Sequence, residues 1–272
     1  MFKDFHKQNK AEITSLVKSY LEEALFADNP NLKQDVIAVI SGSIASGHYD
    51  QYSDIDLDFY CKDETDVEQY KDSISRFKKS ISMQKDLPIQ IHRLKSLTAT
   101  EKELTNYEND NALRETARSL IVTDPDGNFS ALQQRFEWYP DDVAKQKLQW
   151  LYAQLVFEYE EHFKIASERN DAYYLEVAKL SILRLTGNAL LLANRQWPAF
   201  DKHLVASLMD IEIDAYLTSL FNKALAENEN VTSIVSELIV AIERYLISGG
   251  YIPKESIKYW IDLRPIYSVN LG

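Results

Sequence analysis

The sequence contains little glycine, one cysteine and no long apolar segment. Only 7 of its 272 residues are glycine, against roughly 7 per cent in average proteins, which excludes collagen-like and glycine-rich linker chains. The single cysteine, Cys61, cannot form an intramolecular disulfide, so a reducing cytoplasm is the expected compartment. No apolar run reaches the roughly 18 residues of a membrane span, and the first residues are too polar for a secretory signal. We therefore expect no membrane partner.

Basic residues are also scarce relative to acidic ones. The chain has 30 Lys and Arg against 42 Asp and Glu, which gives a formal charge of −12. A protein that binds nucleic acid needs a basic face to neutralise phosphates, so nucleic acid is not an expected partner. The acidic excess either serves solubility alone or favours a cationic small molecule over an anionic one.

Helical and strand patterns alternate in the first half of the chain. Apolar residues at helical spacing predict a helix over about 8–27, and a polar helical stretch follows over about 65–82. β-branched runs and period-2 alternation predict strands at 36–40, 54–60 and 88–92. From about residue 140 onward the patterns are helical throughout, over about 140–168, 171–194, 202–227 and 229–247. The expected fold class is α+β, with a mixed sheet and helices first and an all-helical part second.

The segment from 39 to 56 combines residue types that are typical of a functional site. A strand leads into Gly42-Ser43, a turn follows, and Asp54 and Asp56 lie two residues apart on the next strand. Glycine lets backbone amides approach a phosphate closely, and the Ser43 hydroxyl is a further donor. Two carboxylates on one strand face form an oxygen-only site that suits Mg²⁺. The pattern therefore predicts a site for a nucleoside triphosphate and its metal.

The alternative interpretation is a loop whose aspartates are merely solvated. It must account for three acids at alternate positions, Asp54, Asp56 and Asp58, on one strand face. Such a face repels itself unless a cation is present. The metal-site interpretation is therefore preferred.

An apolar strand followed by Gly-Ser and then Asp-x-Asp resembles the nucleotidyltransferase signature of the DNA polymerase beta superfamily. The stretch from Gly42-Ser43 to Tyr52-Ser53-Asp54-Ile55 looks most like kanamycin and lincosamide nucleotidyltransferases. The resemblance implies a nucleotidyltransferase domain over 1–137 and a helical substrate-binding domain over 138–272. It also implies Mg²⁺, ATP as co-substrate, an antibiotic-like acceptor and, as in some relatives, a homodimer. Nucleotide contacts are expected from Gly42, Ser43, Ser46 and Ser53.

Two positions depart from the superfamily pattern. Related enzymes often place a third carboxylate where this chain has Gln90, and a Lys or Arg where it has Ser46. Gln90 can coordinate through its amide oxygen but cannot take a proton. His92, two residues further along the same strand, is either a functional residue or a satisfied structural histidine. The cation missing at position 46 would have to come from His48 or from the helical domain.

The reaction also requires a general base for the acceptor hydroxyl. In the family of the kanamycin enzyme that base is a glutamate of the helical domain, and Glu158 is the best local match. Glu158, Glu161 and His162 are spaced i, i+3 and i+4, so they share one helical face. Glu161 is the alternative base, and a solvated acidic helix face is the alternative to both.

The resulting prediction is a metal-dependent adenylyltransferase that acts on a small, preferably cationic molecule. A second possibility is a nucleotide-binding regulatory protein that kept the fold and lost catalysis, for which Gln90 and Ser46 are the evidence. A third is transfer of the nucleotide to a protein. The sequence does not decide the acceptor.

Overall fold

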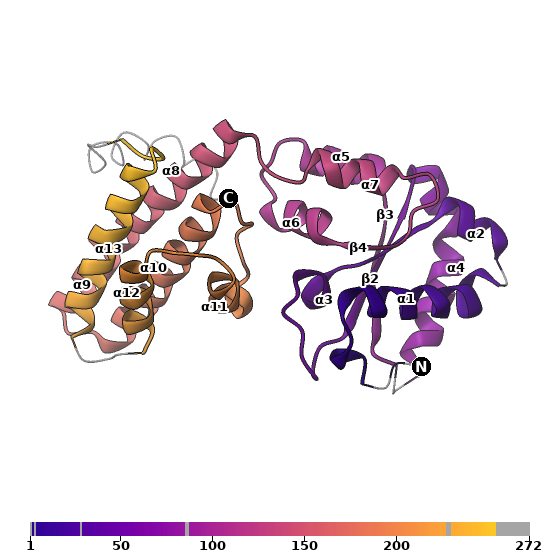
Figure 1. Cartoon of the computed structure of the whole chain (residues 1–272), viewed down its shortest axis with the longest axis horizontal. Coiled ribbons are helices and arrows are strands. Elements are labelled where there is room, and N and C mark those ends of the chain that lie inside the picture. Colours follow the sequence, from indigo (N-terminus) through magenta and orange to yellow (C-terminus); the bar gives the residue numbers. More distant parts are fainter. Residues whose placement is uncertain (1, 3, 28, 85–86, 227–229, 254–272) are drawn as a thin grey trace. The chain divides into compact units, whose positions relative to one another are not determined.

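The computed structural model of the chain describes residues 1–272 except 1, 3, 28, 85–86, 227–229 and 254–272 (Figure 1). The chain divides into two compact units, Met1–Trp138 and Tyr139–Gly272. The first unit combines a sheet with helices, whereas every regular element described in the second unit is a helix. The predicted α+β class is therefore confirmed. Among the described residues, no helix has both the length and the apolar character needed to cross a membrane.

A four-stranded sheet of order β3-β2-β1-β4 forms the centre of the first unit. Its strands are β1 (Ile37–Ile40), β2 (Ile55–Cys61), β3 (Ile89–Ser96) and β4 (Leu120–Thr123). The helices are η1 (Phe5–Lys7), α1 (Lys10–Leu21), η2 (Glu22–Phe26), α2 (Pro30–Asp35), α3 (Gly42–Ser46), α4 (Glu64–Ser82), α5 (Leu97–Leu104), α6 (Asp110–Arg118) and α7 (Asn128–Arg135). β1 is antiparallel to both β2 and β4, while β2 and β3 are parallel. The sheet is therefore mixed.

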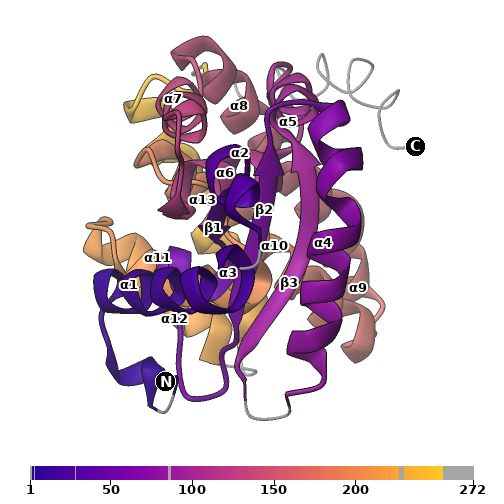
Figure 2. The ribbon, with the colours of Figure 1, turned by 90° about the vertical axis from the view of Figure 1, so that its right-hand side faces the viewer.

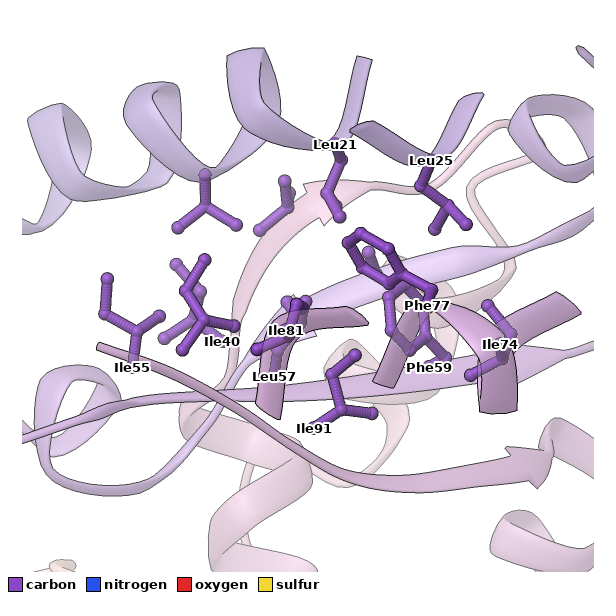
Figure 3. Packing of buried hydrophobic residues seen from close by; sticks show 14 of the residues in the cluster. Leu21, Leu25, Ile40, Ile55, Leu57, Phe59, Ile74, Phe77, Ile81 and Ile91 are labelled. Atoms are coloured by element: carbon purple, nitrogen blue, oxygen red, sulfur yellow. The ribbon is translucent and has the colours of Figure 1, made fainter. Parts of the chain in front are cut away.

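The two faces of β2 have opposite character, because successive side chains of a strand point to opposite sides of the sheet. Ile55, Leu57 and Phe59 are fully buried in the apolar core of the unit (Figure 3). The residues between them are the acids Asp56 and Asp58. The predicted period-2 pattern is thus confirmed, and it places all the acids of β2 on the face away from this core.

Helices α1 and α4 supply the side chains that cover the apolar face. Ile13, Val17 and Leu21 of α1 and Ile74 and Phe77 of α4 belong to the same buried cluster, and α4 runs beside β3 (Figure 2). Each such side chain contributes about 1.5–3 kcal/mol of hydrophobic stabilisation when fully buried. The capped starts of both helices fix where these apolar stripes begin. At α1, the Asn9 side chain accepts from Glu12 N and the Glu12 side chain accepts from Asn9 N.

The second unit is built around α10 (Ala172–Ala193). Its other elements are α8 (Asp141–Phe157), η3 (Glu158–Phe163), α9 (Lys164–Glu168), α11 (Asp201–Met209), α12 (Ala215–Ala226) and α13 (Val231–Ser248). Gly187 lies inside α10, where a Cβ atom would come within 2.9 Å of Leu204 Cδ1 of α11. A glycine at this position therefore allows the two helices to pack closely.

The structure differs from the predicted elements at several places, including the following. The expected helix over 202–227 is two helices, because the carboxylate of Asp214 accepts from the backbone N–H groups of Tyr216 and Leu217 and starts α12 anew. The expected turn after Gly42 contains the one-turn helix α3. Strand β4 has no counterpart in the prediction, since its four residues form a strand only by pairing with β1.

Candidate functional site

The strand β1 leads directly into the turn that the sequence predicts to hold phosphate. The backbone N–H of Ser41 donates to the carbonyl of Asp56 at 2.8 Å, which extends the β1–β2 pairing by one residue. Gly42 and Gly47, at the two ends of α3, have φ values of +67° and +87°. This left-handed region is accessible to glycine at little cost and to other residues only with strain. The backbone geometry of the turn therefore requires both glycines.

Gly42 also allows the turn to approach Asp56, one of the two predicted metal ligands. A Cβ atom at position 42 would lie 1.8 Å from Asp56 Oδ2, far inside any permitted contact. Only a residue without a side chain can place its backbone this close to the carboxylate. The structure thus brings together Gly42 and Asp56, which are separated by the whole loop between β1 and β2.

Asp54 and Asp56 each contact a side chain of the neighbouring strand β3. Gln90 Nε2 donates to Asp54 Oδ2, and His92 Nε2 lies 2.7 Å from Asp56 Oδ1. Asp56 is the register partner of Gln90 in this parallel pair. Because Gln90 and His92 are two residues apart, both lie on the acidic face. The two β3 positions that the sequence singled out therefore border the predicted metal site.

A β-bulge in β3 changes which later residues reach this face. Leu57 is paired with Ile91, but Phe59 is paired with Leu94, so β3 has one extra residue between these two pairs. Such a bulge re-aims the side chains beyond it. Arg93 therefore lies on the acidic face directly after His92, although strict alternation would have sent it to the core.

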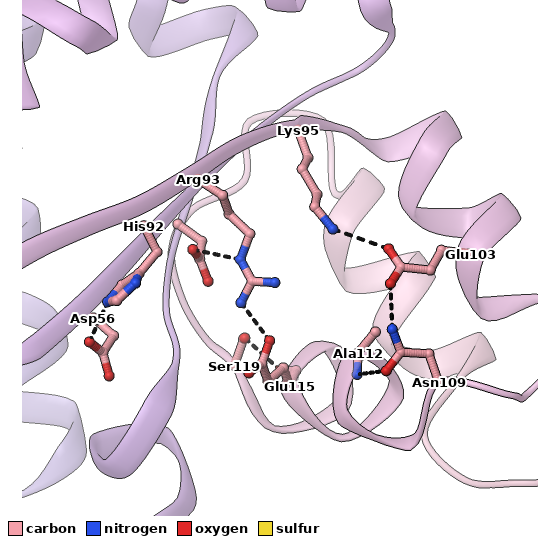
Figure 4. A network of polar contacts seen from close by, with 10 residues as sticks. Asp56, His92, Arg93, Lys95, Glu103, Asn109, Ala112, Glu115 and Ser119 are labelled. Carbon is pink, nitrogen blue, oxygen red and sulfur yellow. Dashed lines mark hydrogen bonds and ion pairs between the residues drawn. The ribbon is translucent and has the colours of Figure 1, made fainter. Parts of the chain in front are cut away.

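Arg93 joins two carboxylates within the polar network shown in Figure 4. Its Nε donates to Asp58 Oδ1 at 2.9 Å and its Nη2 donates to Glu115 Oε2 at 2.5 Å. The Asp58 side chain is only 1% exposed, so its charge needs this partner. Asp58 is thus neutralised by Arg93, which leaves Asp54 and Asp56 as the accessible carboxylates.

The electrostatics of Asp56 favour a cation beside it. Burial raises the pKa of its carboxyl above the ordinary value; His92 opposes this shift, and the nearby charges of Asp58 and Asp54 add to it. The ionised carboxylate is therefore disfavoured in the protein alone, and a bound cation would relieve the penalty. In addition, Asp58 Oδ2 is buried and has no hydrogen-bond partner among the described residues.

The oxygen donors present here fit Mg²⁺ when a nucleotide supplies the remaining ligands. Within the described part of the chain, no group of three or more His, Cys, Asp or Glu is arranged to hold a metal ion. Mg²⁺ in nucleotide sites is commonly bound by one or two carboxylates together with substrate phosphates and water. Asp54 and Asp56 satisfy that requirement, and the Gln90 amide offers a further oxygen.

The three serines predicted to contact the nucleotide have different surroundings. Ser43 lies in the first turn of α3, directly after the close approach of Gly42. Ser46 Oγ donates to the Ser43 carbonyl at 2.9 Å, so its hydroxyl is used inside α3. Ser53 Oγ accepts from Asp50 N and donates to the Asp50 side chain, which closes the loop before β2. Ser43 is therefore the best placed of the three.

The predicted base, Glu158, begins the π-helical segment η3 of the second unit. Burial raises the pKa of its carboxyl, while His162 and Arg184 lower it. Glu161 is exposed. A carboxylate with a raised pKa is the better proton acceptor near neutral pH, which suits Glu158 to the role of a base. His162 itself contacts the Tyr174 hydroxyl through Nδ1 and lies edge-on to Phe157, with ring centroids 5.1 Å apart.

Sequence reasoning missed two cations that the fold places near the site. Arg93 was foreseeable in part, because a third buried acid on β2 requires a compensating charge. Lys10 had no local signal: it starts α1, yet its Nζ donates to the Ala45 carbonyl of α3 at 2.7 Å. Only the packing of α1 on the sheet brings these distant residues together.

Comparisons with known proteins yield a family match and similarities to solved structures. A family model described as a domain of unknown function (DUF4037) matches residues 106–204, which is less than half of the chain. A search of curated proteins found no match. Among solved structures, a nucleotidyltransferase-like protein from Exiguobacterium sibiricum 255-15 is similar, with 14% identity and a TM-score of 0.49 over 86% of this chain and 78% of that one.

Proposed function

We propose that the protein transfers AMP from ATP to a hydroxyl group of a small molecule and releases pyrophosphate. The observation that carries this proposal is the contact between the turn and the acidic face. Gly42 lies so close to Asp56 that no side chain fits between them. The turn can contact phosphate, and the carboxylates beside it can hold a divalent cation. That combination suits a metal-bound triphosphate.

In the proposed reaction, residues 42 and 43 would contact the phosphates, and Asp54 and Asp56 would hold Mg²⁺. When bound, the ion supplies charge neutralisation for the triphosphate. The acceptor oxygen forms a bond to the α-phosphorus while the bond from that phosphorus to its bridging oxygen breaks. Pyrophosphate leaves with the bridging oxygen and its electron pair. The proton of the acceptor hydroxyl goes to the proposed base, Glu158.

The proposed acceptor is a cationic, aminoglycoside-like molecule, with a lincosamide as the neutral alternative. The chain charge of −12 and the exposed Glu161 near Glu158 favour a cation. This part of the proposal rests on charge and on the sequence resemblance. Pyrophosphate release measured across both antibiotic classes tests it, and equal inactivity with all of them overturns it.

A second candidate is nucleotide binding without turnover. It is favoured by one specific contact, the hydrogen bond from Gln90 to Asp54 at the position where related enzymes often carry a third carboxylate. The two candidates differ in products. The first releases pyrophosphate with an acceptor, whereas the second binds Mg-ATP and releases none.

Two glycine substitutions test the observation on which the proposal depends, the close approach of Gly42 to Asp56. Gly42 and Gly127 both have positive φ, but a Cβ atom at Gly127 would meet nothing within 4 Å. Gly42→Ala and Gly127→Ala therefore carry a comparable backbone strain of about 1–2 kcal/mol, and only Gly42→Ala displaces the Asp56 carboxylate. We expect Gly127→Ala to bind Mg-ATP like wild type and Gly42→Ala to lose binding. Equal affinities of the two variants would remove the basis of the proposal.

A further inference from the structure

The second unit contains a cavity of about 170 Å³, bordered by α10, α11 and α12. Helices α11 and α12 both pack against α10. The lining includes three residues from each of these two helices: Val205, Leu208 and Met209 of α11, and Thr218, Phe221 and Asn222 of α12. Each set has the spacing i, i+3 and i+4, so each helix presents one face to the cavity.

The buried part of the lining is apolar. Leu190 of α10 and Phe221 of α12 both line the cavity, and only 1% and 5% of their surfaces are exposed. None of the described residues that line the cavity is charged. A charged group placed inside would lose its hydration and find no ionic partner in the lining. The cavity therefore suits an uncharged molecule.

The rim of the cavity contains apolar side chains that are exposed to water. Met209 is 82% exposed and Val205 is 41% exposed. A methionine side chain is flexible and adapts to irregular apolar surfaces. Exposed apolar side chains beside an apolar cavity are typical of a ligand site. Met209 is thus placed where its side chain can cover an apolar ligand.

Two polar side chains of α12 add hydrogen-bonding groups to this lining. Thr218 and Asn222 are one helical turn apart. Thr218 Oγ1 donates to the Asp214 carbonyl at 3.1 Å, so its hydroxyl can only accept a hydrogen bond from a ligand. The exposed Asn222 makes no hydrogen bond within the part of the chain that the structure describes, and its amide keeps both donor and acceptor. A ligand group that both donates and accepts matches this pair.

We propose that the cavity binds a small uncharged molecule with an apolar body the size of one ring and one amide-like group. An engineered apolar cavity of about 150 Å³ holds benzene, so the volume here suits a ring with a short substituent. The ring packs on Leu190 and Phe221, and the amide pairs with Asn222 and donates to Thr218. The inference stands apart from the proposed function, since it uses none of the residues assigned to AMP transfer.

The test is an NMR titration of the whole chain, isotope-labelled at its methionine methyl groups. The probes are benzamide, toluene and benzoate, which share one ring and differ in their substituent. We expect benzamide and toluene to shift the Met209 signal to saturation, with dissociation constants of about 1 mM, as is usual for ligands of this size. Benzoate should bind roughly tenfold more weakly or less, because its charge has no partner. Met83, which is 68% exposed in the first unit, should not respond.

Two variants locate the site and assign its polar group. Val205→Phe fills the rim with a ring and should weaken both ligands roughly tenfold or more. Its control is Val240→Phe on α13, because Val240 is 44% exposed and does not line the cavity. Asn222→Leu should weaken benzamide about fivefold and leave toluene at its wild-type affinity, because only benzamide uses the amide. All three positions are exposed, so we expect unchanged melting temperatures.

Four results would overturn the inference. Met209 shifts that saturate with neither neutral probe, or that Met83 shares, mean that no site exists here. Wild-type affinities in Val205→Phe place the binding elsewhere. Equal losses of benzamide and toluene in Asn222→Leu remove the amide-like group from the assigned ligand class. Benzoate that binds as tightly as benzamide removes its neutrality. A failure of the proposed function appears in the Mg-ATP titration instead, which none of these results changes.

Discussion

The two faces of β2 serve opposite purposes, although they alternate residue by residue along one strand. On one face Leu57 and Phe59 are fully buried beneath α1 and α4. On the other, Asp56 carries a raised pKa and Asp58 depends on Arg93 for its neutralisation. The first face gains hydrophobic free energy from burial. The second face lowers stability, because its carboxylates are partly buried and lie close to one another. Such arrangements are common at functional sites, where a ligand can compensate the charge.

The largest effect is expected on the apolar face. Phe59→Ala removes a fully buried ring that lies 6.5 Å from the Phe77 ring, centroid to centroid. The lost burial and the residual cavity should lower the free energy of unfolding by about 4 kcal/mol. Urea denaturation measures it, with Tyr52→Ala as the control because Tyr52 is 83% exposed. Similar losses for the two variants would mean that this face is not the stabilising one.

The buried ion pair of the acidic face should rank second. Arg93→Met leaves Asp58 buried without its cation and should cost about 3 kcal/mol of unfolding free energy. The exposed Arg76 on α4 provides the control Arg76→Met, which we expect to stay within about 0.5 kcal/mol of wild type. A loss as small as that of Arg76→Met would contradict the assignment of Arg93 as the partner that Asp58 requires.

The smallest stability effect, with the opposite sign, is expected at Asp56. Its folded-state pKa is raised, so its favourable contribution exists when it is protonated and is lost as pH rises through that pKa. Asp56→Asn should therefore unfold at the same or a higher temperature than wild type at pH 7, and the difference should vanish in acid. Thermal unfolding across pH measures this, with the exposed Asp72→Asn as control. A clear destabilisation at neutral pH would show that Asp56 is structural.

Much of this comparison could be predicted from the sequence. The alternation of β2 fixed which residues are buried, and Gly-Ser followed by Asp-x-Asp placed the turn next to the acids. Gly42 was predicted as the point where the backbone approaches a phosphate, which stays a prediction; what the structure shows is its close approach to the Asp56 carboxylate. These features are local, since they depend on strand periodicity and on the conformational freedom of glycine.

The charges that surround the site could not be predicted in the same way. Arg93 reaches Asp58 because of a bulge that depends on the pairing of β2 with β3, and Glu115 comes from α6. Lys10 reaches Ala45 across 35 positions of sequence. Periodicity within one segment carries no information about such contacts, because they follow from how helices pack on the sheet. The roles of Ser46 and Ser53 likewise depend on hydrogen bonds that composition does not reveal.

The central claim is that the acidic face of β2 and the Gly42 turn bind a nucleotide together with a divalent cation. Calorimetric titration of wild type and Asp56→Asn with ATP, in Mg²⁺ and in EDTA, tests it most directly. The account predicts that wild type binds ATP in Mg²⁺ and much more weakly in EDTA, and that Asp56→Asn loses the Mg²⁺-dependent part while remaining folded. Binding that is the same with and without Mg²⁺, or unchanged in Asp56→Asn, would contradict it.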